Sequence, residues 1–335
     1  MRLLLYGHEA CREHHAGRWH PEQPHRLDAV AKGVRASGVE VIAREAPRAP
    51  LESLHLVHRP SYVSGVREFC ATGGGPLDPD TSVSEGSWEA AIRAAGAGLA
   101  AVEALRTGEG EAAFLATRPP GHHATRDQSM GFCIFNNIGI AAAHLAATGD
   151  RVAIVDWDIH HGNATQEMFY GRSDVLYIST HEFPFYPGTG WIDEEGTDDG
   201  AGYNINIPLP AGSAGDVFEE AWERVVVPVL GVYQADWILV SAGFDGHAAD
   251  PLANCRLHEN DYGRMSHRLA ALAPGRLVFF LEGGYDPEAI AVSVEMVVRG
   301  AAGEFPDLSG DESPRRSFHM LDVAAAQAGR AWDLL

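Results

Sequence analysis

The sequence predicts an α/β fold, in which one open parallel sheet has helices on both of its faces. Near-continuous apolar runs recur along the 335 residues, and amphipathic stretches of helical length separate them. Strands that are apolar on both sides are typical of a parallel sheet buried between helices. Four of these runs are followed by residues with chemical function. In such a sheet these residues meet beyond the carboxyl ends of the strands, so we expect a single domain with one functional cleft.

The expected elements are spread along the chain, with none between residues 38 and 83. The N-terminal MRLLLYGHEA reads as a first strand, because its apolar run stops at a His and a Glu. A long Ala/Gly-rich helix is expected from Ser84, its candidate N-cap, to Gly108, a typical C-terminal residue. Other expected helices are 24–37, 134–147, 214–233, 259–272, 287–299 and one after Pro314, and other strands are 175–180 and 203–207. Residues 194–202 are expected to form a surface loop, and 301–335 a C-terminal extension packed on the domain.

The segment RVAIVDWDIHHGNATQ (151–166) places Asp156, Asp158 and His160 at alternating positions after a short apolar run. Alternate residues of a strand point to the same side, so these three side chains share a face. Zinc takes Asp and His at about 2.0–2.2 Å, whereas an ideal strand separates the outer two by roughly 13 Å. We therefore expect Asp158 and His160 to be ligands and Asp156 to lie behind them. The alternative, a capped turn with incidental polar residues, would bury these groups without compensation.

Three other apolar runs end in a comparable way. EAAFLATRPPGHH delivers His122 and His123, DWILVSAGFDGH delivers Asp245, and RLVFFLEGGYD delivers Tyr285. Two carboxylates and one imidazole leave a zinc ion an open position for water, as in catalytic sites. Activated water, an imidazole pair and a phenol are together the parts needed to hydrolyse an amide. The alternative for His122 and His123 is a pair of hydrogen-bonded core histidines.

Composition argues against several classes of partner. The formal net charge of −21 disfavours nucleic acid, whose binding requires basic patches. No apolar stretch approaches the roughly 18 residues of a membrane-spanning helix, so no membrane partner is expected. The four cysteines form no CxxC pair, which favours a reducing, cytoplasmic location. The sequence does not determine whether the protein forms a homo-oligomer.

Seven ordered motifs carry a resemblance to a known family. They are HPEQPHRL (20–27), RPPGHHA (118–124), GFCIFNN (131–137), DWDIHHGNATQ (156–166), PGTG (187–190), SAGFD (241–245) and EGGYD (282–286). Together they resemble the histone deacetylase family, in particular its class II and bacterial deacetylase-like branch, with the related acetylpolyamine amidohydrolases. The similarity extends to about Arg299. It implies an arginase/deacetylase-like fold with an open parallel sheet.

The resemblance implies a role for each matching residue. The implied zinc ligands are Asp158, His160 and Asp245. His123 corresponds to the general base and acid, and His122 to an electrostatic partner oriented by Asp156. Tyr285 corresponds to the donor that polarises the scissile carbonyl. Asn163 stands where other members have an Asp behind the second histidine, as is usual in the class II branch. An amide stabilises an imidazolium less than a carboxylate does, so we expect His123 to be less basic.

The resemblance further implies a narrow acyl-lysine tunnel and bound potassium. Gly131, Phe132 and Tyr186 correspond to tunnel-lining residues, Leu252 to a residue of the cleft mouth, and Arg26 to the arginine of an internal acetate-release channel. The positions of an inner potassium ion are Asp156, Asp158, His160, Ser179 and Thr180. Those of an outer ion, mostly through backbone carbonyls, are Phe169, Arg172, Val175 and Tyr203.

The expected function is zinc-dependent removal of acetyl or related acyl groups from the ε-amine of lysine in proteins or peptides. One alternative is an amidohydrolase of acetylpolyamines or other small N-acetyl-amines. Polyamine-selective relatives of the eukaryotic type carry Glu where this chain has Leu252, whereas bacterial ones narrow the cleft through loops at a dimer interface, so this alternative stays open. The natural substrate, the acyl preference and the native metal (zinc, iron or cobalt) are not determined by the sequence.

Two more distant alternatives are disfavoured. An arginase-like ureohydrolase requires two manganese ions and an Asp at the place of His247, which we expect to be a rim or structural residue. A non-enzymatic binding module is expected to lose a ligand or the tyrosine, and neither is missing here.

Overall fold

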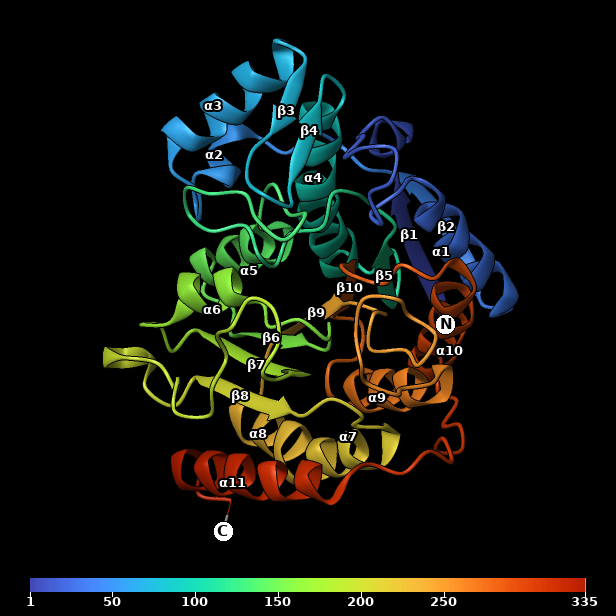
Figure 1. Cartoon of the computed structure of the whole chain (residues 1–335), viewed down its shortest axis with the longest axis vertical. Coiled ribbons are helices and arrows are strands. Elements are labelled where there is room, and N and C mark those ends of the chain that lie inside the picture. The colour runs from blue at the N-terminus through green and yellow to red at the C-terminus, as the bar shows by residue number, and fades with distance from the viewer. Residues whose placement is uncertain (335) are drawn as a thin grey trace.

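The computed structural model describes residues 1–334, and its centre is an eight-stranded sheet (Figure 1). In spatial order the strands are β2 (Glu40–Glu45), β1 (Arg2–Gly7), β5 (Ala112–Leu115), β10 (Leu277–Leu281), β9 (Trp237–Ala242), β6 (Val152–Asp156), β7 (Val175–Glu182) and β8 (Asn204–Leu209). Every neighbouring pair is parallel. The predicted open parallel sheet is therefore confirmed.

Helices cover both faces of this sheet (Figure 1). One face carries α1 (His25–Ala36), α7 (Gly215–Ala221), α8 (Val227–Tyr233), α9 (Glu259–Leu272), α10 (Pro287–Ala301) and α11 (Arg315–Trp332). The other carries α2 (Leu51–Leu54), α3 (Pro60–Ala71), α4 (Ser87–Arg106), α5 (Asn137–Ala147) and α6 (Asn163–Phe169). Short 3₁₀ turns span Glu9–Arg12 and Asp198–Gly200, and a small antiparallel hairpin is formed by β3 (Gly74–Pro76) and β4 (Ser82–Ser84).

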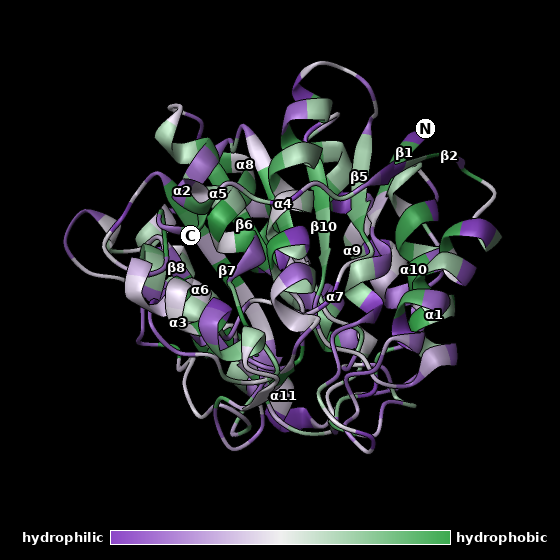
Figure 2. Cartoon of the chain, turned by 90° about the horizontal axis from the view of Figure 1, so that it is seen from above, coloured by the Kyte–Doolittle hydropathy of each residue, from purple (hydrophilic) through white to green (hydrophobic). Residues whose placement is uncertain are grey.

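Alternate residues of each central strand enter different hydrophobic clusters. In β10, Phe279 packs with the α9–α10 side, whereas Val278 and Phe280 pack with the α4–α5 side. The central strands are accordingly mostly apolar, while hydrophilic residues lie in the loops and on the helices around them (Figure 2). This two-sided burial explains why the sequence shows continuous apolar runs here and no alternation.

The strand order brings the four functional runs together. The strands β5, β10, β9 and β6 are consecutive neighbours at the centre of the sheet. The register aligns Leu115 with Phe280, Phe280 with Ser241, and Ser241 with Asp156, so the carboxyl ends lie level. Residues that follow these ends therefore share one cleft.

Several element boundaries differ from those expected. The helix predicted from Ser84 begins at Ser87 instead, and the Ser84 N–H donates to the Ser87 hydroxyl. The helix predicted over 214–233 contains a π-helical segment, Trp222–Val226, between α7 and α8. Pro228, two residues after this segment, has no N–H to donate, which favours such an irregular turn.

The helices and strands missed by the sequence analysis are β2, α2, α3, α6 and the β3–β4 hairpin. The edge strand β2 is largely exposed, so it has no apolar pattern that could mark it. The C-terminal helix α11 packs on β8 and α7 and covers the opposite edge of the sheet. Within residues 1–334, no helix combines the length and apolar character that crossing a lipid bilayer would require.

Candidate active site

A cavity of about 140 Å³ opens at the carboxyl edge of the four central strands. Its lining residues are Asp80, Pro120, His122, His123, Gly131, Phe132, Cys133, Asp158, His160, Tyr186, Leu252, Gly283 and Tyr285. Residues from distant parts of the chain thus converge on one small space. A cavity of this size suits one extended side chain.

Asp158, His160 and Asp245 form a compact group at the base of this cavity. Their ligand atoms all lie within 4.8 Å of one another. His160 Nδ1 lies 3.2 Å from Asp158 Oδ1 and 3.0 Å from Asp245 Oδ2. Ligand atoms of a tetrahedral zinc ion lie about 3.3–3.6 Å apart, given bonds of about 2.0–2.2 Å. The three predicted ligands are therefore close to the spacing that such an ion requires.

The surroundings of this group favour a cation at its centre. The Gly283 N–H donates to Asp158 Oδ2 at 2.7 Å, and the Ile159 N–H donates to Asp245 Oδ1 at 3.1 Å, which leaves an oxygen of each carboxylate facing His160. A Cβ on Gly283 would lie 1.9 Å from Asp245 Oδ2, so only glycine fits there. Burial opposes the imidazolium, but Asp245 and Asp158 outweigh it and raise the pKa of His160 to about 10.

The two histidines of RPPGHHA have different partners. His122 Nδ1 lies 3.1 Å from Asp156 Oδ2, and His123 Nδ1 lies 2.8 Å from Asn163 Oδ1. Burial alone would lower the pKa of His122, but Asp158 and Asp156 raise it to about 10. Burial, followed by the charges of His122 and His160, lowers the pKa of His123 well below its usual value. The pair is therefore divided into a cationic imidazole and a neutral one, and the neutral one can accept a proton.

Tyr285 closes the cavity from the side of β10. Its N–H donates to Asp250 Oδ2 at 2.6 Å, and the Arg26 guanidinium lies 5.1 Å from its ring. Burial and then Asp245 raise the pKa of the phenol well above its usual value, so it stays a hydrogen-bond donor. Arg26 does not line the cavity; its Nε donates to the Gly284 carbonyl at 2.6 Å. In this structure Arg26 thus supports the turn that carries Tyr285.

Phe132 and Tyr186 form walls of the cavity. Gly131 and Phe132 have φ values of 55° and 68°, and a Cβ on Gly131 would lie 2.3 Å from the His123 ring. This turn is held by Asp80 Oδ1, which accepts the Gly131 N–H at 2.9 Å, and by the Thr81 hydroxyl, which accepts the Phe132 N–H at 2.9 Å.

Tyr186, also in the lining, lies edge-on to His123 with the ring centroids 5.2 Å apart. Leu252 belongs to the same lining.

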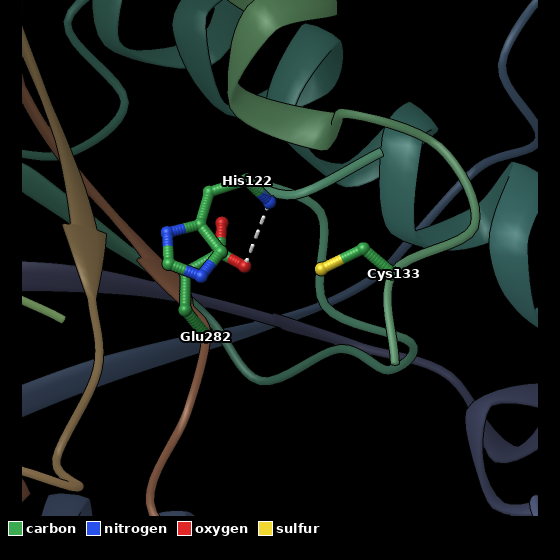
Figure 3. A group of neighbouring side chains, drawn as sticks. All are labelled: His122, Cys133 and Glu282. Carbon is green, nitrogen blue, oxygen red and sulfur yellow. Dashed lines mark hydrogen bonds between the residues drawn. The ribbon is translucent and has the colours of Figure 1, made fainter. Parts of the chain in front are cut away.

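Glu282 is a buried carboxylate next to His122 (Figure 3). Its Oε2 accepts the N–H groups of Gly121 and His122, at 2.7 and 3.2 Å. Burial raises the pKa of Glu282 to about 7. The ligand atoms of Glu282, His122 and Cys133 also lie within 4.8 Å of one another. Because the carboxylate binds the backbone of the His122 turn and the His122 ring faces Asp156, this group serves to hold that turn.

His247, His258 and Glu259 form a further group with that spacing. The His247 Nδ1 accepts the Ala249 N–H at 3.1 Å, so its ring proton resides on Nε2, which faces Glu259 at 3.6 Å. An Nε2 that carries a proton is a donor, and a metal ligand must offer a lone pair. The geometry therefore suits the structural role expected for His247.

The positions matched to potassium fall in two places. Asp156 and Ser179 are register partners on β6 and β7, and the Thr180 hydroxyl is buried without a hydrogen-bond partner within the described residues. The outer set, Phe169, Arg172, Val175 and Tyr203, surrounds the end of α6 and the starts of β7 and β8. The carbonyls of Phe169 and Tyr203 each accept one N–H already, and keep a second lone pair.

Some residues of the cavity were not found from the sequence. Asp80 and Cys133 line it, and Phe185 stacks on His160 at 5.2 Å. Asp80 lies in the loop between β3 and β4, an element that was itself missed, and no spacing marks it as a site residue. Phe185 is adjacent to Tyr186, so the aromatic pair before the PGTG motif was the available signal.

A parallel sheet with two carboxylates and a histidine grouped at its carboxyl edge defines an α/β protein with a candidate metal centre. A protein-family model described as the histone deacetylase domain matches residues 20–301. The chain is 37% identical to a histone deacetylase-like amidohydrolase of Pseudomonas aeruginosa, over 92% of this chain and 87% of that protein. It is 38% identical to histone deacetylase 15 of Arabidopsis thaliana, over 86% of this chain and 54% of that protein.

A crystal structure of the HDA15 HD domain superimposes with a TM-score of 0.94 at 33% identity, covering 100% of this chain and 98% of that one. The chain belongs to the histone deacetylase family. Membership and fold support an amide-hydrolysing enzyme.

Proposed function

We propose that this protein is a zinc-dependent deacylase of acyl-lysine side chains in proteins or peptides. The observation that carries the proposal is the convergence of the Asp158, His160 and Asp245 group, the histidine pair and Tyr285 at the base of one narrow cavity. Asp and His ligands with an open side suit zinc, which activates water and polarises a carbonyl oxygen when bound.

The histidine pair supplies the proton transfers. The neutral His123 accepts a proton from the attacking water and returns it to the leaving amine. His122 holds a positive charge beside it, because Asp158 and Asp156 stabilise its imidazolium. The amide of Asn163 orients the His123 ring without adding a negative charge, which keeps its basicity low.

Tyr285 and the cavity walls complete the site. The phenol donates a hydrogen bond to the oxyanion that develops on the scissile carbonyl. The aromatic walls, Phe132 and Tyr186, contact the methylene chain of the substrate and exclude water from it. Leu252 offers an apolar contact where an amine-selective site would place a carboxylate, which favours acyl-lysine over acetylpolyamines.

The test is a substrate panel with metal-replete protein. Acetyl-lysine peptides, trifluoroacetyl-lysine and N-acetylated polyamines are compared by kcat/KM, before and after metal removal by a chelator. We expect the acyl-lysine substrates to be preferred and activity to return with one equivalent of zinc. A wide preference for polyamines would favour the small-amine alternative, and two required equivalents would favour an arginase-like binuclear site. We also expect kcat/KM to depend on the potassium concentration, independently of the zinc content.

A further inference from the structure

The turn formed by residues 17–20 lies beside the cavity, on a surface that we call the rim, and its Trp19 has no role in the proposed function. Trp19 is 88% exposed, and the next large apolar side chain among the described residues, Val232, is 55% exposed. Single exposed apolar residues are common on soluble proteins, so exposure alone does not make a site. Trp19 differs from such residues because the turn that carries it is held by hydrogen bonds and lies beside the cavity.

The turn that presents Trp19 is tied on both sides. The Gln23 side-chain amide donates to the carbonyls of Gly17 and His20, at 2.7 and 2.8 Å. The His20 N–H donates to the Gly17 carbonyl at 3.2 Å, and Gly17 adopts φ 129°, which favours glycine. The backbone on either side of Trp19 is thus already ordered, so a contact with its indole costs little further backbone entropy.

This turn stands beside the cavity. The His20 ring lies edge-on to Phe132 at 4.3 Å, and its Nε2 lies 3.1 Å from the Asp80 carbonyl. Phe132 and Asp80 both line the cavity. Neighbouring Cα atoms are about 3.8 Å apart, so the backbone of Trp19 lies directly next to that of His20, which contacts this wall.

A peptide substrate must place its flanking residues on this rim, because the cavity admits only one extended side chain. The Arg18 guanidinium lies 5.1 Å from the Trp19 ring centroid, so a cation from the substrate would be repelled there. A neutral apolar or aromatic side chain meets no such penalty and can stack on the indole.

We propose that Trp19 is a specificity-determining residue that contacts an apolar or aromatic side chain next to the acyl-lysine of a peptide substrate. The inference rests on the proposed function, since it needs an acyl-lysine in the cavity. It further implies that small amines with free ammonium groups gain nothing from this surface.

The test compares wild type with Trp19→Ala on three substrates: capped acetyl-lysine without neighbours, a Gly-flanked acetyl-lysine peptide and a Phe-flanked one. An aromatic pair corresponds to an affinity change of about 2- to 12-fold, so KM for the Phe-flanked peptide should rise by that factor with kcat unchanged. The other two substrates should be unaffected, and Trp19→Phe should retain most of the preference. Phe305→Ala removes an exposed aromatic side chain that lies against Arg264, away from the cavity lining, and should change none of the values.

Equal KM values of wild type for the Gly- and Phe-flanked peptides would overturn the inference, as would a Trp19→Ala effect of the same size on all three substrates. With N-acetylated polyamines measured as a fourth substrate, a rise in KM for them alone in Trp19→Ala would assign the rim to amines and overturn the inference too. Failure of the proposed function looks different, because wild type would then hydrolyse none of the three substrates.

Discussion

Replacing Tyr285 by Phe separates catalysis from stability in this protein. The variant removes only the phenol oxygen, and the ring keeps its contacts with Phe132 and Arg26. The Tyr285 backbone remains bound to Asp250, so the fold and the grouping of the metal ligands should persist. Loss of a donor to a developing oxyanion costs about 10²–10³ in kcat, equivalent to about 2.7–4 kcal/mol of transition-state stabilisation.

The assay measures kcat on an acetyl-lysine peptide together with bound metal and thermal unfolding. Tyr62→Phe is the matched control, because the Tyr62 hydroxyl donates to the Ile134 carbonyl at 2.6 Å and lines no part of the cavity. That variant should lose about 1 kcal/mol of unfolding free energy and keep its kcat. If Tyr285→Phe turned over at a near wild-type rate on every substrate, the phenol would not be the donor. A large kcat loss in Tyr62→Phe would show that kcat responds to the loss of any buried phenol, and the Tyr285→Phe result would then not identify the donor.

Three further predictions address the metal, the base and the mouth of the cavity. Asp245→Asn should lower bound zinc below one equivalent per chain, measured by elemental analysis; full retention would remove Asp245 from the ligand set. Asn163→Asp places a carboxylate 2.8 Å from His123 Nδ1, which raises the pKa of His123. As the pH falls, His123 is then protonated at a higher pH than in the wild type. The acid limb of the kcat/KM profile should therefore shift to higher pH, and an unshifted limb would mean that another group is the base. Leu252→Glu should raise kcat/KM for acetylspermidine relative to an acetyl-lysine peptide by about several-fold, since a partly desolvated ion pair exceeds the roughly 0–1 kcal/mol of an exposed one. Leu252→Gln is the neutral control, and an unchanged ratio would place Leu252 away from the substrate.

The elements predicted best are those whose burial is one-sided or complete. The helix α9 has the predicted bounds 259–272, because the acidic Glu259 and Asp261 mark its first turn and its apolar residues repeat at helical spacing. The strand β2 was missed since its side chains face solvent, and the hairpin that carries Asp80 is too short to show a pattern. Local sequence does not predict an element that is stabilised by tertiary contacts and shows no periodic pattern of buried residues.

The candidate site divides in the same way. The sequence by itself indicated that Asp158 and His160 lie together, because they are two positions apart after an apolar run, although β6 ends at Asp156 and both residues lie in the turn beyond it. The family resemblance, and not local spacing, implied that the amide of Asn163 lies behind His123. Strand order alone decided that β9 lies between β10 and β6, which brings Asp245 to 3.0 Å from His160. Likewise, only the folded chain places Asp80 against Gly131 and the Glu282 carboxylate under the His122 turn. Such contacts join residues 51 and 161 positions apart, and the free energy that forms them comes from the burial of the whole sheet.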